Sequence, residues 1–154
     1  MSADKPIAPI RYNSFYPRGV DEKRRIQVPA KWRPSGGGVE FTIIVWPDEP
    51  AGIYLRVIPP EGMAKLDEIL GEILRKDPRK GVLKRVIGKN SEQVALDRAG
   101  RICLPDSMAQ AAGIKDEAVL VGCIDHFQIW NPERYKNVQV SDEVLAAEAF
   151  KLIP

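Results

Sequence analysis

The sequence predicts an α+β protein, mainly β, in which two similar halves follow one another in tandem with short flanking helices. Thirteen prolines and twelve glycines in 154 residues imply many turns between short elements. Several stretches alternate apolar with polar residues, a period of two that is typical of strands. A nine-residue pattern also occurs twice, 76 positions apart. Together these features favour a duplicated, strand-rich fold over a bundle of long helices.

The duplication rests on two pairs of matching segments. DEKRRIQVP at 21–29 matches DRAGRICLP at 97–105, and LRVIPPE at 55–61 matches FQIWNPE at 127–133 with an offset of 72. Both pairs occur in the same order, which favours an internal repeat over coincidence. We therefore expect three units: a first domain over 11–76, a second domain over 77–140, and a C-terminal helix over 141–154.

The first half begins with a short strand after its D-x-x-x-R turn. Ile26 and Val28 alternate there with polar residues, which places the apolar side chains on one face, and Pro29 stops the strand. Apolar runs over 41–46 and 53–58 predict two further strands. A helix follows from Pro59-Pro60-Glu61, because proline and glutamate both suit a helix N-terminus.

The second half repeats this order. Ile102 and Leu104 form the counterpart strand, and Pro105 opens a short helix that Gly113 caps. Runs over 118–123 and 127–130 predict two strands joined at Asp125-His126. We expect a short helix from Pro132 and a further helix from Ser141 or Asp142 to Lys151. The basic and apolar segment 77–92 is expected to pack one half against the other.

Charge alternates along the chain although the formal net charge is only +2. Residues 1–40 and 75–101 carry net charges of +4 and +6, whereas 41–74 and 102–154 each carry −4. If the two basic segments meet on one surface, they form a positive face that attracts a polyanion. The alternative is a set of solvated surfaces without a partner.

The reactive residues do not build a recognisable enzyme. His126 is the only histidine, and Cys103 and Cys123 are the only cysteines. Cys123-x-x-His126 lacks the companion ligands of a zinc site, and no nucleotide-binding loop or nucleophile elbow occurs. We predict no catalytic residue, metal, cofactor or small-molecule substrate, with Cys123 in the core and His126 at an exposed hairpin tip.

No apolar stretch approaches the ~18 residues of a membrane span, and the N-terminus lacks the apolar core of a signal peptide. Two cysteines cannot supply a disulfide scaffold, which fits a reducing compartment. We therefore expect a cytoplasmic protein without a membrane partner.

At this point the motifs resemble those of the MraZ family of bacterial transcriptional regulators. The resemblance covers roughly residues 11–140 and is strongest in the second half, through LDRAGRICLP at 96–105, AGI at 112–114, VLVG at 119–122 and FQIWNPERY at 127–135. VDEKRRIQVPAKWR at 20–33 also fits, except that Arg24 stands where the family usually has glycine. The resemblance implies two swapped-hairpin β-barrel halves of the AbrB/SpoVT type. It also implies a ring-shaped homo-oligomer that binds repeated operator elements on double-stranded DNA.

The D-x-x-x-R turns supply the candidate binding chemistry. An aspartate four residues before an arginine can hold the guanidinium in a bidentate pair, so we expect Asp21 and Asp97 to orient the loops. Arginine and lysine can bind phosphate, and the arginine fork also matches the guanine edge. The predicted DNA-binding residues are Lys23, Arg24, Arg25, Arg98 and Arg101. The alternative for Arg25 and Arg101 is a purely structural role in holding the fold. Arg24 stands at a turn position where a positive φ would favour glycine.

We expect a sequence-specific DNA-binding transcriptional regulator, associated with the nucleoid. The resemblance implies a repressor of the cell-division and cell-wall gene cluster that includes its own gene. Neighbours in a ring keep one direction along the rim, so such a protein should read direct repeats. The alternative is an oligomeric interaction scaffold that keeps the fold without specific DNA binding.

Overall fold

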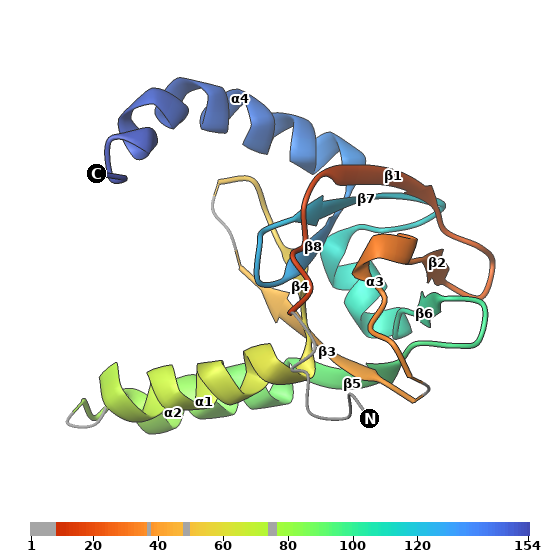
Figure 1. The fold of residues 1–154 in the computed structure, drawn as a ribbon, viewed down its shortest axis with the longest axis horizontal. Coiled ribbons are helices and arrows are strands. Elements are labelled where there is room, and N and C mark those ends of the chain that lie inside the picture. The colour runs from red at the N-terminus through yellow and green to blue at the C-terminus, as the bar shows by residue number, and fades with distance from the viewer. Residues whose placement is uncertain (1–8, 37, 48–49, 74–76) are drawn as a thin grey trace, which may run out of the picture.

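The computed structural model describes residues 9–36, 38–47, 50–73 and 77–154. Along the chain, pairs of consecutive strands are separated by helical segments (Figure 1). The strands are β1 (Phe15–Gly19), β2 (Arg25–Gln27), β3 (Glu40–Trp46), β4 (Tyr54–Ile58), β5 (Ser91–Ala95), β6 (Arg101–Cys103), β7 (Glu117–Gly122) and β8 (Phe127–Trp130). The helices are a 3-10 turn (Ala30–Trp32), α1 (Pro60–Ile73), α2 (Lys80–Lys89), α3 (Asp106–Ala112) and α4 (Pro132–Phe150). The predicted class, α+β and mainly β, is confirmed.

Strands of both halves share one antiparallel sheet. The order β1-β7-β8-β4-β3-β5 places β1 of the first half against β7 of the second, and β5 of the second half against β3 of the first. Each half thus contributes a strand to the other, as a swapped arrangement requires. Within the described residues the sheet is open, with β1 and β5 at its edges, and it is not a closed barrel.

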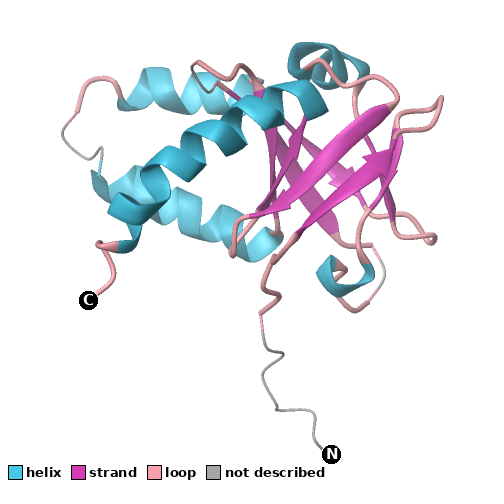
Figure 2. Cartoon of the chain, turned by 90° about the horizontal axis from the view of Figure 1, so that it is seen from above, coloured by secondary structure: helices cyan, strands magenta, loops and turns pink. Residues whose placement is uncertain are grey.

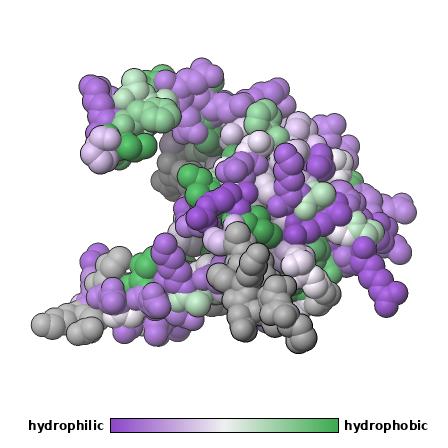
Figure 3. Space-filling view, in the orientation of Figure 1, coloured by the Kyte–Doolittle hydropathy of each residue, from purple (hydrophilic) through white to green (hydrophobic). Residues whose placement is uncertain are grey.

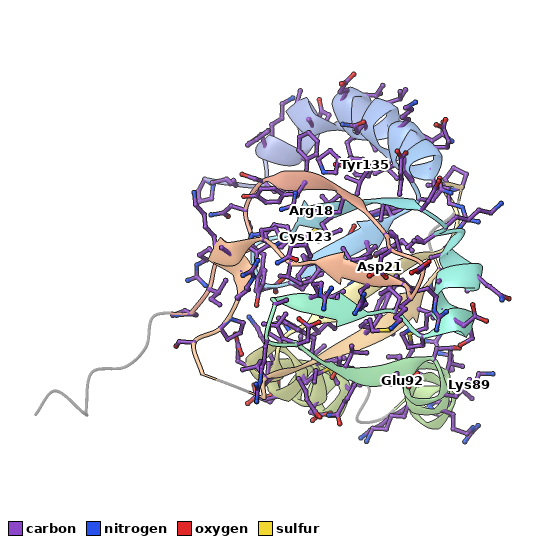
Figure 4. All side chains as sticks on the ribbon, turned by 90° about the vertical axis from the view of Figure 1, so that its right-hand side faces the viewer. Arg18, Asp21, Lys89, Glu92, Cys123 and Tyr135 are labelled. Carbon is purple, nitrogen blue, oxygen red and sulfur yellow. The ribbon has the colours of Figure 1, made fainter. Side chains whose placement is uncertain are left out.

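A separate two-stranded ribbon brings the two repeat motifs together. β2 and β6 pair antiparallel, with Ile26 opposite Ile102, Arg25 opposite Cys103 and Gln27 opposite Arg101. Because positions 26 and 102 correspond in the repeat, a pseudo-twofold axis passes between them. The ribbon lies between β1 and β5 (Figure 4).

The core lies between the ribbon and the sheet. Ile26, Val28, Ile102 and Leu104 are all fully buried, which confirms the predicted inward faces of both motif strands. Aromatic rings join them: Trp32 contacts Tyr12, Tyr16 and Phe127 at centroid distances of 5.8, 5.2 and 5.0 Å. The ribbon is therefore fixed by burial on its inner face, while its outer face stays available.

Helix α3 matches its prediction, because Pro105 precedes it and Gly113, at φ 68°, caps it. The two predicted C-terminal helices are wrong. A single helix, α4, runs from Pro132 to Phe150. No glycine or proline occurs between 133 and 153, so nothing in that stretch interrupts the backbone hydrogen bonds after Ser141.

The prediction for residues 77–92 is also wrong in its first part. Helix α2 has no buried residue, and Val82, Leu83 and Val86 on it are exposed. Within this segment the part that joins the halves is the start of β5, which pairs with β3 along five residue positions. The boundary predicted between residues 76 and 77 adjoins 74–76, which lie outside the described residues, and the division into three units stays a prediction.

The helices α1, α2 and α4 extend to one side of the molecule, away from the strands (Figure 2). In the space-filling view α4 forms one arm and α1 with α2 another, with a gap between the two arms (Figure 3). None of the described helices is long and apolar enough to cross a membrane.

Candidate nucleic-acid interface

The first D-x-x-x-R turn is organised around Asp21. Its Oδ1 accepts hydrogen bonds from the backbone N–H groups of Lys23 (2.9 Å) and Arg25 (2.8 Å), while its Oδ2 accepts from Arg25 Nε at 2.6 Å. The backbone N–H of Arg24 donates to the Asp21 carbonyl at 2.9 Å and closes the turn. One carboxylate therefore holds both the loop backbone and the side chain of Arg25.

The second turn repeats the arrangement around Asp97. Asp97 Oδ1 accepts from the backbone N–H groups of Ala99 (2.9 Å) and Arg101 (2.8 Å), and Oδ2 accepts from Arg101 Nε at 3.0 Å. The backbone N–H of Gly100 donates to the Asp97 carbonyl at 3.0 Å. The repeat in the sequence is thus a repeat in hydrogen bonding.

The prediction that the aspartate–arginine pairs are bidentate is wrong. Each arginine reaches its carboxylate through Nε alone, because the other carboxylate oxygen is already occupied by backbone donors of the turn. Within the described residues the terminal Nη groups of Arg25 and Arg101 have no hydrogen-bond partner, and each arginine side chain is 32% exposed. Those Nη groups remain available to a ligand outside the protein.

Electrostatics keep both carboxylates ionised. The pKa of Asp21 is lowered from its usual value, chiefly by the backbone hydrogen bond from Arg25 and further by the Arg25 side chain. The pKa of Asp97 is lowered in the same way, chiefly by the backbone hydrogen bond from Arg101. Both effects stabilise the charged form of a group that accepts several hydrogen bonds.

Lys23 and Arg98 differ from these arginines because both are exposed, and neither side chain makes a hydrogen bond or ion pair to the described residues. Each follows its aspartate near the tip of its loop. The two loops lie at opposite ends of the β2–β6 ribbon, because the strands are antiparallel and each loop precedes its own strand. Asp21 marks one of these ends in Figure 4.

Arg24 occupies the position that corresponds to Gly100. Both residues have left-handed backbones, with φ of 63° for Arg24 and 79° for Gly100. The family glycine is therefore explained by conformation, and Arg24 adopts the same conformation at a cost. Its guanidinium is half-buried, and its Nε donates to the Leu104 carbonyl at 2.9 Å, a contact that the sequence did not indicate.

Two further arginines border the ribbon. Arg18 Nε donates to the Gln27 carbonyl at 3.2 Å, and Arg33 Nε donates to the Val28 carbonyl at 2.8 Å. Sequence reasoning missed both, because at the offset of 76 their counterparts are the uncharged Val94 and Ala109. Only the proximity of their side chains to the motif strands identifies them.

The Cys123–His126 turn is placed differently from its prediction. His126 is not exposed at the hairpin tip: its side chain is only 18% exposed, with Nδ1 2.7 Å from Asp125 Oδ1. The exposed residues of the tip are Ile124 and Asp125. Cys123 is half-buried rather than in the core, and burial raises the pKa of its thiol to about 11. Among the described residues no cluster of three potential metal ligands occurs.

Comparisons of the sequence with known proteins identify the family of this chain. A family model for the MraZ protein, described as antitoxin-like, matches residues 89–150. The chain is similar to "Transcriptional regulator MraZ" of Parvibaculum lavamentivorans, with 32% identity over 92% of this chain and 86% of the relative. It is similar to the proteins of the same name from Rhodospirillum rubrum (35% identity; 76% and 77% covered) and Thermomicrobium roseum (31%; 86% and 88%). With such identity over most of its length, this chain belongs to the MraZ family, a family of transcriptional regulators and not of enzymes.

Proposed function

We propose that this protein is a sequence-specific, DNA-binding transcriptional repressor that contacts double-stranded DNA through both D-x-x-x-R loops. The observation that carries the proposal is the pair of matching loops at the two ends of one ribbon. In each loop an aspartate holds the backbone while cationic groups are left without a protein partner. A rigid loop with free cations is preorganised for phosphate and base edges.

The proposed roles differ among the loop residues. Lys23 and Arg98 bind backbone phosphates, because the ammonium of Lys23 and the guanidinium of Arg98 are exposed near the loop tips. Arg25 and Arg101 use their free Nη groups on the DNA while Nε stays with the aspartate. Asp21 and Asp97 orient the loops and touch no DNA. Arg24 adds a charge to the first loop.

Relatives named as transcriptional regulators support a role in controlling transcription, and we place the proposed site upstream of the gene for this protein. We propose direct repeats within the cell-division and cell-wall gene cluster as the operator, and a cytoplasmic, nucleoid-associated protein. Repeats spaced near one helical turn, about 10–10.5 base pairs, would present the same groove face to successive subunits.

We further propose that subunits assemble head to tail into a ring-shaped homo-oligomer. The distal half of α4 and the residues that follow it carry an apolar row that lines a shallow hollow: Leu145, Ala146, Ala149, Phe150 and, beyond the helix, Ile153. Acidic residues flank this row, whereas α2 carries four basic and no acidic residues beside its exposed apolar face. Opposite charge on two different helices favours a heterologous contact between copies, and such contacts form a ring when the rotation between neighbours closes.

The second candidate function is an oligomeric scaffold without specific DNA binding. One observation favours it: Arg24 Nε donates a hydrogen bond to the Leu104 carbonyl, so the guanidinium is not wholly free to bind DNA. The net charge of only +2 points the same way. A direct binding measurement separates the two functions.

The test is binding of the purified protein to the DNA upstream of its own gene, against shuffled DNA of equal length, across a salt series. We expect preference for the upstream DNA and affinity that falls steeply with salt, by about 0.9 log units per log unit for each phosphate neutralised. Lys23→Ala should flatten that slope by roughly one phosphate per bound subunit. Lys136→Ala on α4 removes the same charge away from the loops and should leave the slope unchanged. Equal affinity for upstream and shuffled DNA would favour the scaffold.

A further inference from the structure

In each half an arginine guanidinium lies at an equivalent backbone carbonyl, but the two arginines are not at equivalent positions of the repeat. Val28 and Leu104 are counterparts in the repeat, and the carbonyl of each accepts a hydrogen bond from an arginine Nε. At Leu104 the donor is Arg24, at 2.9 Å, whereas at Val28 the donor is Arg33, at 2.8 Å. Position 109, the counterpart of Arg33, is a buried alanine.

The use of Arg33 rather than an arginine at position 100 depends on the glycine of the second loop. Arg24 reaches its carbonyl from a left-handed position, and the counterpart of that position is Gly100. A Cβ atom on Gly100 would overlap the guanidinium carbon of Arg33. The Arg33 guanidinium therefore fills the space that a side chain at position 100 would take.

Each loop thus has a guanidinium close to its tip. The backbone N–H of Leu104 donates to the Arg24 carbonyl, and that of Val28 donates to the Gly100 carbonyl, so the two carbonyl sites adjoin the first and second loops respectively. The Nη groups of Arg24 and Arg33 have no hydrogen-bond partner among the described residues. Both side chains are half-buried.

The surroundings of Arg33 suit a phosphate. A shallow hollow of about 310 Å³ lies beside it, and Arg98 and Asp97 of the second loop also line this hollow. The Asp97 carboxylate already accepts three hydrogen bonds from its own loop, one of them from the Arg101 side chain, so its charge is paired with that of Arg101. Two arginines therefore face the hollow with unused donors, and planar guanidinium groups match phosphate oxygens.

We propose that Arg33 binds a backbone phosphate of DNA at the second loop, as the counterpart of Arg24 at the first. The inference rests on the proposed DNA-binding function and adds a contact outside both D-x-x-x-R motifs. With Arg33 included, the positive charge beside the two loops is symmetric about the ribbon axis. The loop sequences alone are not symmetric, since Lys23-Arg24-Arg25 in the first loop corresponds to Ala99-Gly100-Arg101 in the second, which Arg98 precedes.

The experiment measures the salt dependence of binding to the upstream DNA for the unmodified protein and three variants, together with the thermal midpoint of each. Arg33→Gln keeps a side-chain N–H donor for the Val28 carbonyl but removes the charge. We expect it to fold normally while its salt slope falls by about 0.9 per bound subunit. Arg33→Lys should retain most of the slope, because it keeps the charge.

The third variant, Arg33→Ala with Gly100→Arg, transplants the arrangement of the first loop onto the second. Removing Arg33 vacates the space above position 100, and an arginine there should reach the Val28 carbonyl as Arg24 reaches Leu104. We expect this double variant to recover the salt slope that Arg33→Gln loses.

The outcomes distinguish this proposal from the proposed function. If the unmodified protein binds and Lys23→Ala flattens the slope, but Arg33→Gln leaves the slope unchanged, Arg33 only caps a carbonyl and the inference is overturned. If the unmodified protein shows no preference for the upstream DNA, the proposed function fails and this inference fails with it. If Arg33→Gln lowers the thermal midpoint strongly, its salt slope is compared with that of Arg33→Lys, and equal slopes overturn the proposal.

Discussion

At the scale of single residues, the loops depend on one strained position and two carboxylates. Arg24 has a left-handed backbone, a conformation that costs a residue with a Cβ atom roughly 1–2 kcal/mol. Its side chain compensates in part through the hydrogen bond to the Leu104 carbonyl. A cost retained beside a candidate binding site is consistent with a functional role for this arginine.

Two substitutions at position 24 separate strain from hydrogen bonding. Arg24→Ala and Arg24→Gly both remove the bond to Leu104, but only glycine relieves the backbone strain. We expect Arg24→Gly to be more stable than Arg24→Ala by about 1 kcal/mol, measured by urea unfolding. Both variants should bind DNA more weakly than the unmodified protein. Equal stability of the two would contradict the strain at this position.

The lowered pKa values of Asp21 and Asp97 predict a dependence of stability on pH. Because the pKa of each folded carboxyl lies below that of the unfolded chain, ionisation stabilises the fold above the unfolded pKa. That contribution disappears as the pH falls through the folded pKa. Between pH 6 and pH 3 the unmodified protein should therefore lose more unfolding free energy than Asp21→Asn with Asp97→Asn. Parallel pH profiles would show that the carboxylates do not stabilise the turns.

At the scale of elements, the β2–β6 ribbon and the six-stranded sheet beneath it fix where the loops lie. β2 and β6 are short, and their inner residues are fully buried beneath neighbouring strands. A three-residue strand has little stability of its own, so its position comes from burial of Ile26 and Ile102. The rigid body under the ribbon keeps the two loops at a fixed separation.

Helix α4 depends on its N-terminal cap. Asn131 Oδ1 accepts hydrogen bonds from the backbone N–H groups of Glu133 (2.8 Å) and Arg134 (3.1 Å), and its Nδ2 donates to the Gly113 carbonyl at 2.7 Å. Asn131→Ala should lower the unfolding free energy by about 1 kcal/mol, within the range measured for such caps. Asn131→Asp keeps the cap oxygen and should recover part of the loss in chemical denaturation. No recovery would assign the effect to the bond with Gly113.

At the scale of the whole molecule, the strands form one compact body, while α4 and the pair α1 and α2 project from it on one side (Figures 1 and 2). Their exposed apolar residues have no partner within the described part of the subunit. The acidic distal half of α4 and the basic α2 lie apart in one subunit, so the contact proposed between them would join two copies.

A charge placed in the apolar row of α4 tests the proposed assembly. Leu145→Glu should convert oligomers to single subunits in light scattering after size-exclusion chromatography, because a carboxylate would be buried in the contact. Binding to repeated DNA should then weaken, since the avidity of several linked loops is lost. Val144→Glu is the matched control, on the same helix but outside the row. A Leu145→Glu protein that remains oligomeric would exclude this face of α4 from the contact.

The sequence by itself determined the repeat and the local structure of both motifs. Aspartate and arginine at that spacing fold the turn, and the alternation around Ile26 and Ile102 makes the strand, because both depend on near neighbours in the chain. The left-handed position of Arg24 was also foreseeable, since its counterpart is a glycine. Similar motifs in known regulators gave the family.

Only the tertiary structure decided which distant residues meet. The pairing of β2 with β6 and of β5 with β3 joins segments far apart in the sequence, and nothing local encodes such contacts. The same holds for Arg33, which has no basic counterpart in the repeat yet lies against Gly100. It holds too for α4, where Ser141 resembles a helix start but the uninterrupted backbone and the cap at Asn131 make one helix. Packing and long-range hydrogen bonds determine these contacts, because they act between groups that only the folded chain brings together.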